Sequence, residues 1–187
     1  MKTKLILIGG VPGTGKTTLA YQLALTLKID KVISTDILKI YTKTFNQDFD
    51  KYIFTTTHEA YKLDNLSIIN GYLKHSQTIN ELVLNILENI KDNVIIIEGS
   101  TINKELIKKI DKDKYEVIYL NLITNKDLLI KRYKQKLKLR QSNWLDNIKV
   151  IEEISSYLSK NNNNFLIDNK NKTTERIIKY VKENLYI

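Results

Sequence analysis

The stretch LILIGGVPGTGKTTL, residues 5–19, decides the fold of this 187-residue chain. Leu5–Ile8 is a short apolar run typical of a buried strand, and residues 10–17 then match the phosphate-binding pattern G-x-x-x-x-G-K-[ST]. Apolar residues return at helical spacing from Leu19 to Leu27. A strand, a glycine-rich loop and a helix in this order predict a phosphate-binding loop rather than a turn that merely joins two elements.

Each residue type in this loop has a chemical role in binding phosphate or its metal ion. Glycines let the backbone curl so that successive N–H groups face a phosphate, and the positive end of the following helix adds to that field. Lys16 is expected to reach the outer phosphates of ATP, and the Thr17 hydroxyl to hold Mg²⁺. The predicted nucleotide-binding residues of the loop are Gly10, Val11, Pro12, Gly13, Thr14, Gly15, Lys16, Thr17 and Thr18.

Composition limits the class of protein. A hydrophobic content of 42% over 187 residues fits one globular domain, residues 1–187. The absence of cysteine excludes disulfides, thiolate metal sites and a cysteine nucleophile. No apolar run approaches the roughly 20 residues that span a bilayer, and the first strand begins too early to leave room for a signal peptide. We therefore expect a soluble, cytoplasmic protein with no membrane contact and no obligate protein partner.

The net charge of +9 is carried almost wholly by lysine, since the sequence has three arginines, Arg132, Arg140 and Arg176. A basic surface attracts anionic ligands such as nucleotides, phosphorylated metabolites or RNA. A plain solvated lysine surface explains the same composition. The charge is therefore compatible with an RNA partner but does not select one.

Strand-like and helix-like segments alternate along the rest of the chain. Further strands are expected at 32–34, 93–98, 115–123 and 164–167, and helices from 37 onward and over 65–89, 103–110, 126–139, 144–159 and 173–185. This alternation predicts a three-layer α/β fold, in which a five-stranded parallel sheet carries helices on both faces. Ligands of such folds gather at the carboxyl ends of the strands.

Two carboxylates stand at predicted strand ends. Asp36 follows the strand at 32–34, where a carboxylate can accept the proton of an attacking hydroxyl or orient it toward the outer phosphate. The alternative is that Asp36 caps a helix beginning at Ile37. Glu98 ends the strand at 93–98, a pattern typical of a second magnesium ligand acting through water. The alternative for Glu98 is an ordinary polar residue at a strand end.

The basic segment at about 126–142 is the candidate for a small helical lid. It contains two of the three arginines, Arg132 and Arg140. Phosphoryl transfer requires positive groups on the migrating phosphate, and guanidinium groups contact phosphate with two parallel hydrogen bonds. We therefore predict catalytic roles for Arg132 and Arg140 and expect most of the surrounding lysines to be solvated.

The segment YIFTTTHEAYK, residues 52–62, is the candidate for a polar loop on the acceptor side, within a broader acceptor region at about 36–77. Hydroxyls of Thr56 and Thr57, together with His58, suit hydrogen bonding to an anionic substrate. A structural role is the alternative for a lone histidine.

The Asp-Asn pair at 168–169 follows the last predicted strand. Loops at this position in small kinases commonly surround the adenine through backbone groups, so Asn169 is a candidate for nucleotide binding. Turn formation explains an Asp-Asn pair equally well.

The order of these motifs resembles the small P-loop kinases, and most closely the archaeal-type 2-phosphoglycerate kinases. The segments that carry the resemblance are GGVPGTGKTT (9–18), VISTDILK (32–39), TTTHEAYK (55–62), GYLKHSQTINELV (71–83), VIIIEGS (94–100), IKRYKQK (130–136), WLDNIKVIEEISSYL (144–158) and FLIDN (165–169). They span nearly the whole chain in the expected order. The phosphate loop is highly specific for nucleotide binding, whereas most of the other segments carry weight through their order.

The resemblance implies a kinase that uses ATP and Mg²⁺ and has a nucleoside-monophosphate-kinase-like core. The residues that it places around the acceptor are Asp36, Lys39, Thr56, Thr57 and Tyr61. Asp36 would face the acceptor hydroxyl, Lys39 would bind the acceptor's charged group, and Glu98 would serve the metal. The family usually has arginine where Lys39 stands, and its lid is richer in arginine than this one.

These observations predict an ATP-dependent phosphotransferase that acts on a hydroxyl of a small anionic acceptor, with 2-phosphoglycerate or a related phosphorylated metabolite as the first candidate. One alternative is a kinase that acts on RNA or a nucleotide, which the basic surface favours. Another is an ATP-gated binding module with weak hydrolysis. The combination of Asp36 with a basic lid speaks against the binding module, because a switch needs no acceptor pocket.

Overall fold

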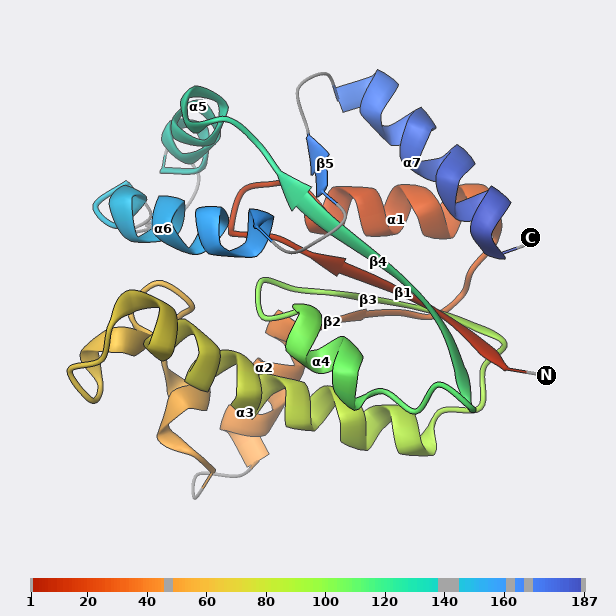
Figure 1. Cartoon of the computed structure of the whole chain (residues 1–187), viewed down its shortest axis with the longest axis horizontal. Helices are drawn as coiled ribbons and strands as arrows, with labels where there is room; N and C mark the ends of the chain where they lie inside the picture. Colours follow the sequence, from red (N-terminus) through yellow and green to blue (C-terminus); the bar gives the residue numbers. More distant parts are fainter. Residues whose placement is uncertain (1, 46–48, 138–144, 161–163, 167–169, 186–187) are drawn as a thin grey trace.

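The computed structural model describes residues 2–45, 49–137, 145–160, 164–166 and 170–185. Its strands form one parallel sheet in the order β2-β3-β1-β4-β5, with helices on both faces (Figure 1). The strands are β1 (Thr3–Gly9), β2 (Val32–Ser34), β3 (Val94–Glu98), β4 (Tyr115–Ile123) and β5 (Asn164–Leu166). The predicted α/β class with a parallel sheet is confirmed.

The helices that cover the sheet are α1 (Lys16–Leu27), α2 (Thr35–Phe45), α3 (Ile68–Asn89), α4 (Lys104–Lys109), α5 (Lys126–Leu137), α6 (Ile148–Ser159) and α7 (Lys170–Leu185). Two short 3₁₀ turns, η1 (Lys51–Phe54) and η2 (Ala60–Lys62), lie between α2 and α3. No helix within these described ranges is long and apolar enough to cross a membrane.

Some helix boundaries differ from the prediction. Helix α3 begins at Ile68 rather than at 65, because the Ser67 side chain caps it by accepting a hydrogen bond from the Asn70 N–H at 3.3 Å. Helix α2 begins at Thr35, two residues earlier than expected. Asp36 therefore lies in the first turn of α2, and the alternative in which it caps a helix beginning at Ile37 is wrong.

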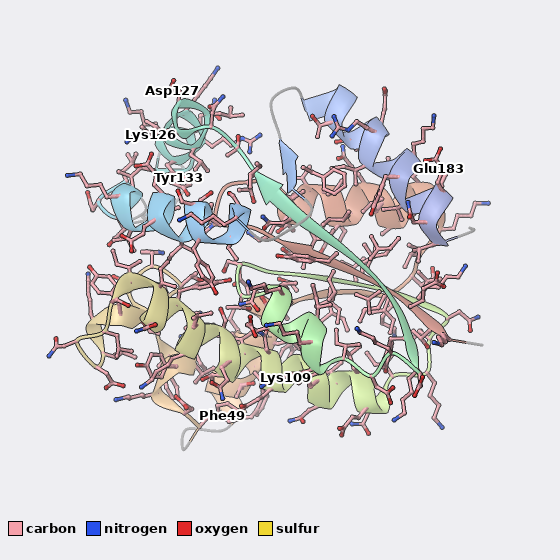
Figure 2. All side chains as sticks on the ribbon, in the orientation of Figure 1. Phe49, Lys109, Lys126, Asp127, Tyr133 and Glu183 are labelled. Carbon is pink, nitrogen blue, oxygen red and sulfur yellow. The ribbon has the colours of Figure 1, made fainter. Side chains whose placement is uncertain are left out.

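Two apolar layers hold the helices to the sheet. One face packs against α1 and α7, with Leu23 and Ile177 among the buried contacts. The other face packs against α3 and α4, with Val83 and Leu106 among them. Figure 2 shows side chains filling the spaces between the sheet and these helices. Because β1 carries apolar residues toward both layers, its four residues at 5–8 have no exposed surface, as expected for a central parallel strand.

A third apolar cluster lies beyond the carboxyl edge of the sheet. It joins Val11 of the phosphate loop to Leu129 and Tyr133 of α5, to α6, and to Tyr72 of α3. The cluster fixes α5 and α6 against the loop, so the elements around the loop belong to the packed body of the protein.

Strand register brings the predicted site residues to one edge. Ile8 of β1 pairs with Glu98 of β3, and Glu98 pairs with Ser34 of β2. The phosphate loop follows β1, and Asp36 follows β2 by two residues. Parallel strands end on the same side of a sheet, so the loop and both carboxylates meet there.

Candidate active site

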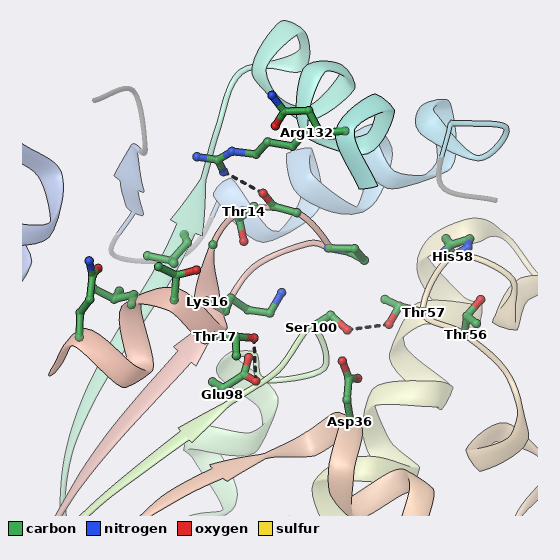
Figure 3. Close-up of a pocket in the computed structure, with 18 of the residues that line it drawn as sticks. Thr14, Lys16, Thr17, Asp36, Thr56, Thr57, His58, Glu98, Ser100 and Arg132 are labelled. Atoms are coloured by element: carbon green, nitrogen blue, oxygen red, sulfur yellow. Dashed lines mark hydrogen bonds between the residues drawn. The ribbon is translucent and has the colours of Figure 1, made fainter. Parts of the chain in front are cut away.

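A cavity of about 700 Å³ opens at the carboxyl edge of the sheet (Figure 3). Residues from seven separate parts of the chain line it: Pro12 to Leu19 with Gln22, Asp36 with Lys39, Thr56 to His58, Glu98 with Ser100, Leu122, Arg132 with Gln135, and Thr174. The cavity therefore gathers most of the residues that the sequence singled out, although they are as much as 120 positions apart.

The phosphate loop has the backbone that its glycines predict. Gly13 and Gly15 adopt positive φ angles of 83° and 102°, which side chains with a Cβ rarely adopt. Lys16 is 9% exposed, and its ammonium group donates a hydrogen bond of 3.1 Å to the carbonyl of Val11. Gly10 and Val11 are not among the residues that line the cavity, and Val11 is buried in the third apolar cluster. The loop residues that reach the cavity are those from Pro12 onward.

Thr17 and Glu98 are the candidate ligands of a magnesium ion. The Thr17 hydroxyl donates a 3.0 Å hydrogen bond to Oε1 of Glu98, which is buried beside the loop. Both side chains offer the oxygen donors that Mg²⁺ prefers, and Mg²⁺ ordinarily takes its remaining ligands from phosphates and water. The described part of the chain has no group of three or more acidic or histidine side chains that could hold a metal. This donor set therefore fits Mg²⁺ bound together with a nucleotide.

Asp36 points into the same cavity from the first turn of α2 (Figure 3). Its carboxylate is exposed to the cavity. An acidic group in the first turn of a helix interacts favourably with the helix dipole. An accessible carboxylate facing the phosphate loop can orient a hydroxyl nucleophile.

Lys39 lies one turn further along α2 and also lines the cavity. Its ammonium group donates to the carbonyl of Thr55, which connects α2 to the acceptor loop. Burial lowers the pKa of Lys39 to about 8, and the positive charge of Lys43 adds to the effect. Asp36 and Glu59 act in the opposite direction. An anionic ligand beside this ammonium group would stabilise its charged form.

The acceptor loop places Thr56, Thr57 and His58 at the cavity wall. Thr57 and Ser100 share a hydrogen bond of 2.8 Å between their hydroxyl groups, and both side chains line the cavity. The Thr56 hydroxyl donates to Glu59 Oε2 at 2.6 Å. Because each hydroxyl has a single proton, the Thr57–Ser100 pair keeps one O–H group for an anionic substrate, and Thr56 would exchange Glu59 for that substrate.

Tyr61 is predicted to line the acceptor loop but is not among the residues that line the cavity. Its backbone packs directly on α3, where a Cβ added to Gly71 would lie 2.3 Å from the Tyr61 Cα. Gly71 therefore permits the close approach that fixes the acceptor loop against α3.

His75 lies below the acceptor loop and is buried. Its Nδ1 is 2.8 Å from the carbonyl oxygen of Tyr52, and burial, aided by the charge of Lys39, lowers the pKa of His75 to about 4. A histidine that stays neutral and hydrogen-bonds backbone supports the loop and does not take part in proton transfer near neutral pH.

Helix α5 brings Arg132 to the cavity. One guanidinium N–H donates a 2.8 Å hydrogen bond to the carbonyl of Gly13, and burial lowers the pKa of the guanidinium (Figure 3). Arg132 thus lies beside the loop that would hold the outer phosphates. The other predicted catalytic arginine, Arg140, and the predicted nucleotide residue, Asn169, lie outside the described residues.

Several cavity residues were missed by the sequence-based prediction. Ser100 follows Glu98 by two residues, so its place just past a central strand end could have identified it. Gln22 and Thr174 also line the cavity, and the Thr174 hydroxyl donates a hydrogen bond to Gln22 Oε1 at 3.3 Å. Their helices, α1 and α7, meet only in the folded chain, and no local pattern marks either residue.

Gly99 allows the end of β3 and the start of α2 to lie close together. A Cβ at this position would lie 1.8 Å from Oγ1 of Thr35, the residue before Asp36. We expect Gly99→Ala to lower the melting temperature, because overpacking of this kind costs about 1–3 kcal/mol, and to reduce kcat by shifting Asp36 away from Glu98. Thermal unfolding and steady-state kinetics measure the two effects.

The double variant Gly99→Ala/Thr35→Ala serves as the control for this prediction. It removes the Oγ1 and Cγ2 atoms that collide with the new methyl group and should recover part of the lost stability. If Gly99→Ala is as stable and active as the wild type, the contact does not constrain the site.

The loop, the Thr17–Glu98 pair and the order of the parallel sheet define a P-loop α/β protein. The chain belongs to the isopentenyl transferase family, whose model matches residues 3–185.

Individual relatives give a more specific likeness. A 2-phosphoglycerate kinase of Methanocaldococcus jannaschii is 29% identical over 165 residues, which cover 82% of this chain and 53% of that protein. A mevalonate-3-phosphate 5-kinase of Thermoplasma acidophilum is 31% identical over 103 residues, or 51% of this chain and 50% of that one. The resemblance to archaeal 2-phosphoglycerate kinases is confirmed. The chain spans 53–64% of the length of the 2-phosphoglycerate kinases that it matches.

Solved structures agree on the fold. The structure of shikimate kinase from Bacteroides thetaiotaomicron superposes with a TM-score of 0.55 at 18% identity and covers 99% of both chains. At this identity the likeness shows a shared architecture. The architecture of this chain is therefore that of a small P-loop kinase.

Proposed function

We propose that the protein is an ATP-dependent kinase that transfers the γ-phosphoryl group to a hydroxyl of a small phosphorylated acid, with 2-phosphoglycerate as the first candidate. The observation that carries the proposal is the single cavity shared by the phosphate loop, the Thr17–Glu98 pair and Asp36. Nucleotide phosphates on the loop and a hydroxyl at Asp36 would face each other across that cavity. Such an arrangement suits in-line transfer.

In the proposed mechanism the protein positions the reactants and neutralises charge. Lys16 and the loop N–H groups hold the outer phosphates. Thr17 and Glu98 hold Mg²⁺, which supplies further positive charge at those phosphates. Asp36 orients the acceptor hydroxyl and accepts its proton. Arg132 exchanges the Gly13 carbonyl for the migrating phosphoryl group, where its charge is of most use.

The acceptor end of the cavity favours an anionic substrate. Lys39 is the cation there, and Thr56, Thr57 and Ser100 add hydroxyl groups. A small phosphorylated acid would form charge-assisted hydrogen bonds with this set. The relatives named 2-phosphoglycerate kinase and mevalonate-3-phosphate 5-kinase support a phosphorylated acceptor of this kind.

Isopentenyl transfer is the second candidate, and the family to which the chain belongs favours it. The phosphate loop could hold the diphosphate of an isoprenoid donor. An isoprenoid chain would require apolar walls, however, and the apolar side chains among the described lining residues are Pro12, Leu19 and Leu122, all outside the acceptor loop. The polar acceptor end therefore favours phosphoryl transfer.

The domain organisation follows from the same proposal. We propose that residues 1–187 form one kinase unit, with the acceptor region at about 36–77 and a lid at about 126–142. ATP, Mg²⁺ and a small anionic acceptor are its proposed ligands, and RNA is a weaker alternative as acceptor. The described part of the lid, α5, packs on the phosphate loop through the third apolar cluster.

The test of this function is a comparison of kcat/KM for 2-phosphoglycerate, nucleosides and a short RNA with ATP as the donor. A parallel reaction supplies an isoprenoid diphosphate in place of ATP. We expect 2-phosphoglycerate to give the highest kcat/KM. If RNA or a nucleoside is better by tenfold or more, the acceptor assignment is wrong, and turnover of the isoprenoid diphosphate alone would replace the kinase by the second candidate.

The ionisation of Lys39 should make kcat/KM for the acceptor depend on pH. With a pKa of about 8, the Lys39 ammonium is charged below that pH and loses its proton as the pH rises through it. We expect kcat/KM for the acceptor to fall above pH 8, since that ratio reports the free enzyme. Below pH 8, Lys39→Ala should raise KM for the acceptor more than KM for ATP, and this difference from the wild type should shrink as the pH rises above 8.

Lys39→Arg is the control, because arginine stays charged throughout this range. It should keep activity and abolish the alkaline decline. An unchanged decline in Lys39→Arg would assign the titration to another group.

A further inference from the structure

Tyr133 lies where α5 meets the phosphate loop and has no exposed surface. Its hydroxyl donates a hydrogen bond of 2.6 Å to the carbonyl of Pro12. The ring is in such close contact with the loop that a Cβ on Gly13 would lie 2.5 Å from the Tyr133 Cε1. Leu129, one helical turn earlier, would lie 3.3 Å from the same added atom. These contacts therefore fix the position of Pro12 and Gly13 relative to α5.

The hydrogen bonds from α5 fix two consecutive peptide groups of the loop. Tyr133 binds the carbonyl of Pro12, and Arg132 binds the carbonyl of Gly13. In a trans peptide the C=O and N–H bonds point in opposite directions, and the described chain has no cis peptide bonds. Holding the Pro12 carbonyl toward α5 therefore turns the Gly13 N–H away from α5. That N–H is one of the donors that a loop of this type offers to phosphate.

The Arg132–Gly13 hydrogen bond can break when a nucleotide binds, whereas the Tyr133–Pro12 hydrogen bond stays in place. Arg132 lines the cavity, and its guanidinium can move to a phosphate. The Tyr133 hydroxyl is enclosed by the third apolar cluster and the loop, and burial raises its pKa, so it remains a protonated donor. When Arg132 turns to the nucleotide, Tyr133 still holds the loop.

We propose that Tyr133 is a positioning residue whose hydroxyl fixes the Pro12–Gly13 peptide group in the orientation that binds the outer phosphates of the nucleotide. The inference rests on the proposed function, because it requires a polyphosphate ligand. It assigns to α5 a permanent role in nucleotide affinity, in addition to the catalytic role proposed for Arg132.

The test is the Tyr133→Phe variant, which keeps the ring and its packing and removes the hydroxyl. Calorimetry with wild type and variant measures Kd for ATP, tripolyphosphate and AMP. We expect Kd for ATP and for tripolyphosphate to rise by the same factor, about 3- to 10-fold, the range for one lost hydrogen bond. Kd for AMP and KM for the acceptor should stay within about twofold, because neither ligand depends on the loop's hold on outer phosphates.

Tyr115→Phe is the matched control. Tyr115 is also buried, and its hydroxyl also donates to a backbone carbonyl, that of Leu87, at the opposite end of the sheet. The Tyr115→Phe substitution should lower the melting temperature about as much as Tyr133→Phe does, and it should leave Kd for ATP unchanged. A general loss of stability would thereby be separated from a local effect on the loop.

The outcomes distinguish the inference from the proposed function. If the wild type binds neither ATP nor tripolyphosphate, the proposed function and the inference both fail. If the wild type binds both and Tyr133→Phe binds them equally well, the inference alone is overturned. It is also overturned if AMP and the acceptor weaken as much as ATP, since that pattern indicates general disruption of the cavity.

Discussion

Lys16→Ala should lower kcat by at least about 10²–10³-fold, the cost of removing one charged group that stabilises a transition state. Lys16 is the loop cation that lines the cavity, and it is held over the loop by the Val11 carbonyl. A phosphate bound there would take the place of that carbonyl as its partner. ATP binding should weaken as well, while circular dichroism and thermal unfolding remain close to wild type.

Lys109→Ala is the control for this substitution. Lys109 is an exposed lysine in the last turn of α4, outside the cavity, and is labelled in Figure 2. The Lys109→Ala substitution removes one positive charge without affecting the loop, so it should leave kcat unchanged. Normal turnover by a folded Lys16→Ala protein would contradict the kinase proposal altogether.

Asp36→Asn should lower kcat by about 10²-fold or more, the usual contribution of a positioned general base. The amide keeps the shape of the carboxylate but accepts no proton from a hydroxyl near neutral pH. Since Asp36 lies on the acceptor side of the cavity, Kd for ATP should change little. Single-turnover kinetics and calorimetry measure these two quantities separately.

Asp127→Asn controls for the loss of a helix-dipole interaction. Asp127 is an exposed acid in the first turn of α5, as Asp36 is in the first turn of α2, and it does not line the cavity (Figure 2). Both variants should lose about 0.3–1 kcal/mol of stability. If Asp36→Asn keeps its kcat and shows only this loss, Asp36 stabilises a helix and has no catalytic role.

The central elements of the fold were predictable because their patterns are local. A continuous apolar run such as Leu5–Ile8 can be buried on both faces only in a central strand, and a glycine loop followed by helical spacing has few other solutions. Strand ends were equally informative. Because parallel strands end at one edge, Asp36 and Glu98 could be placed beside the loop without any knowledge of their contacts.

The remaining features depend on contacts between distant segments. Tyr133 is one of eleven tyrosines in the sequence, and its bond to Pro12 exists only because α5 folds back over the loop. Gly71 is unfavourable in a helix by local propensity, but the approach of Tyr61 requires it. Tyr61 is part of the acceptor loop in sequence, whereas its packing against α3 places it outside the cavity wall.

The most direct test of the kinase proposal is to follow the γ-phosphoryl group itself. The wild-type protein is incubated with γ-labelled ATP, Mg²⁺ and 2-phosphoglycerate, and the labelled product is identified. With the wild type, we expect the label to appear in a doubly phosphorylated glycerate, with one molecule of this product for each ADP formed. With Lys16→Ala, we expect the label to stay in ATP. Label that appears only as inorganic phosphate, with the 2-phosphoglycerate unchanged, would contradict transfer to this acceptor and indicate an ATP-hydrolysing binding module.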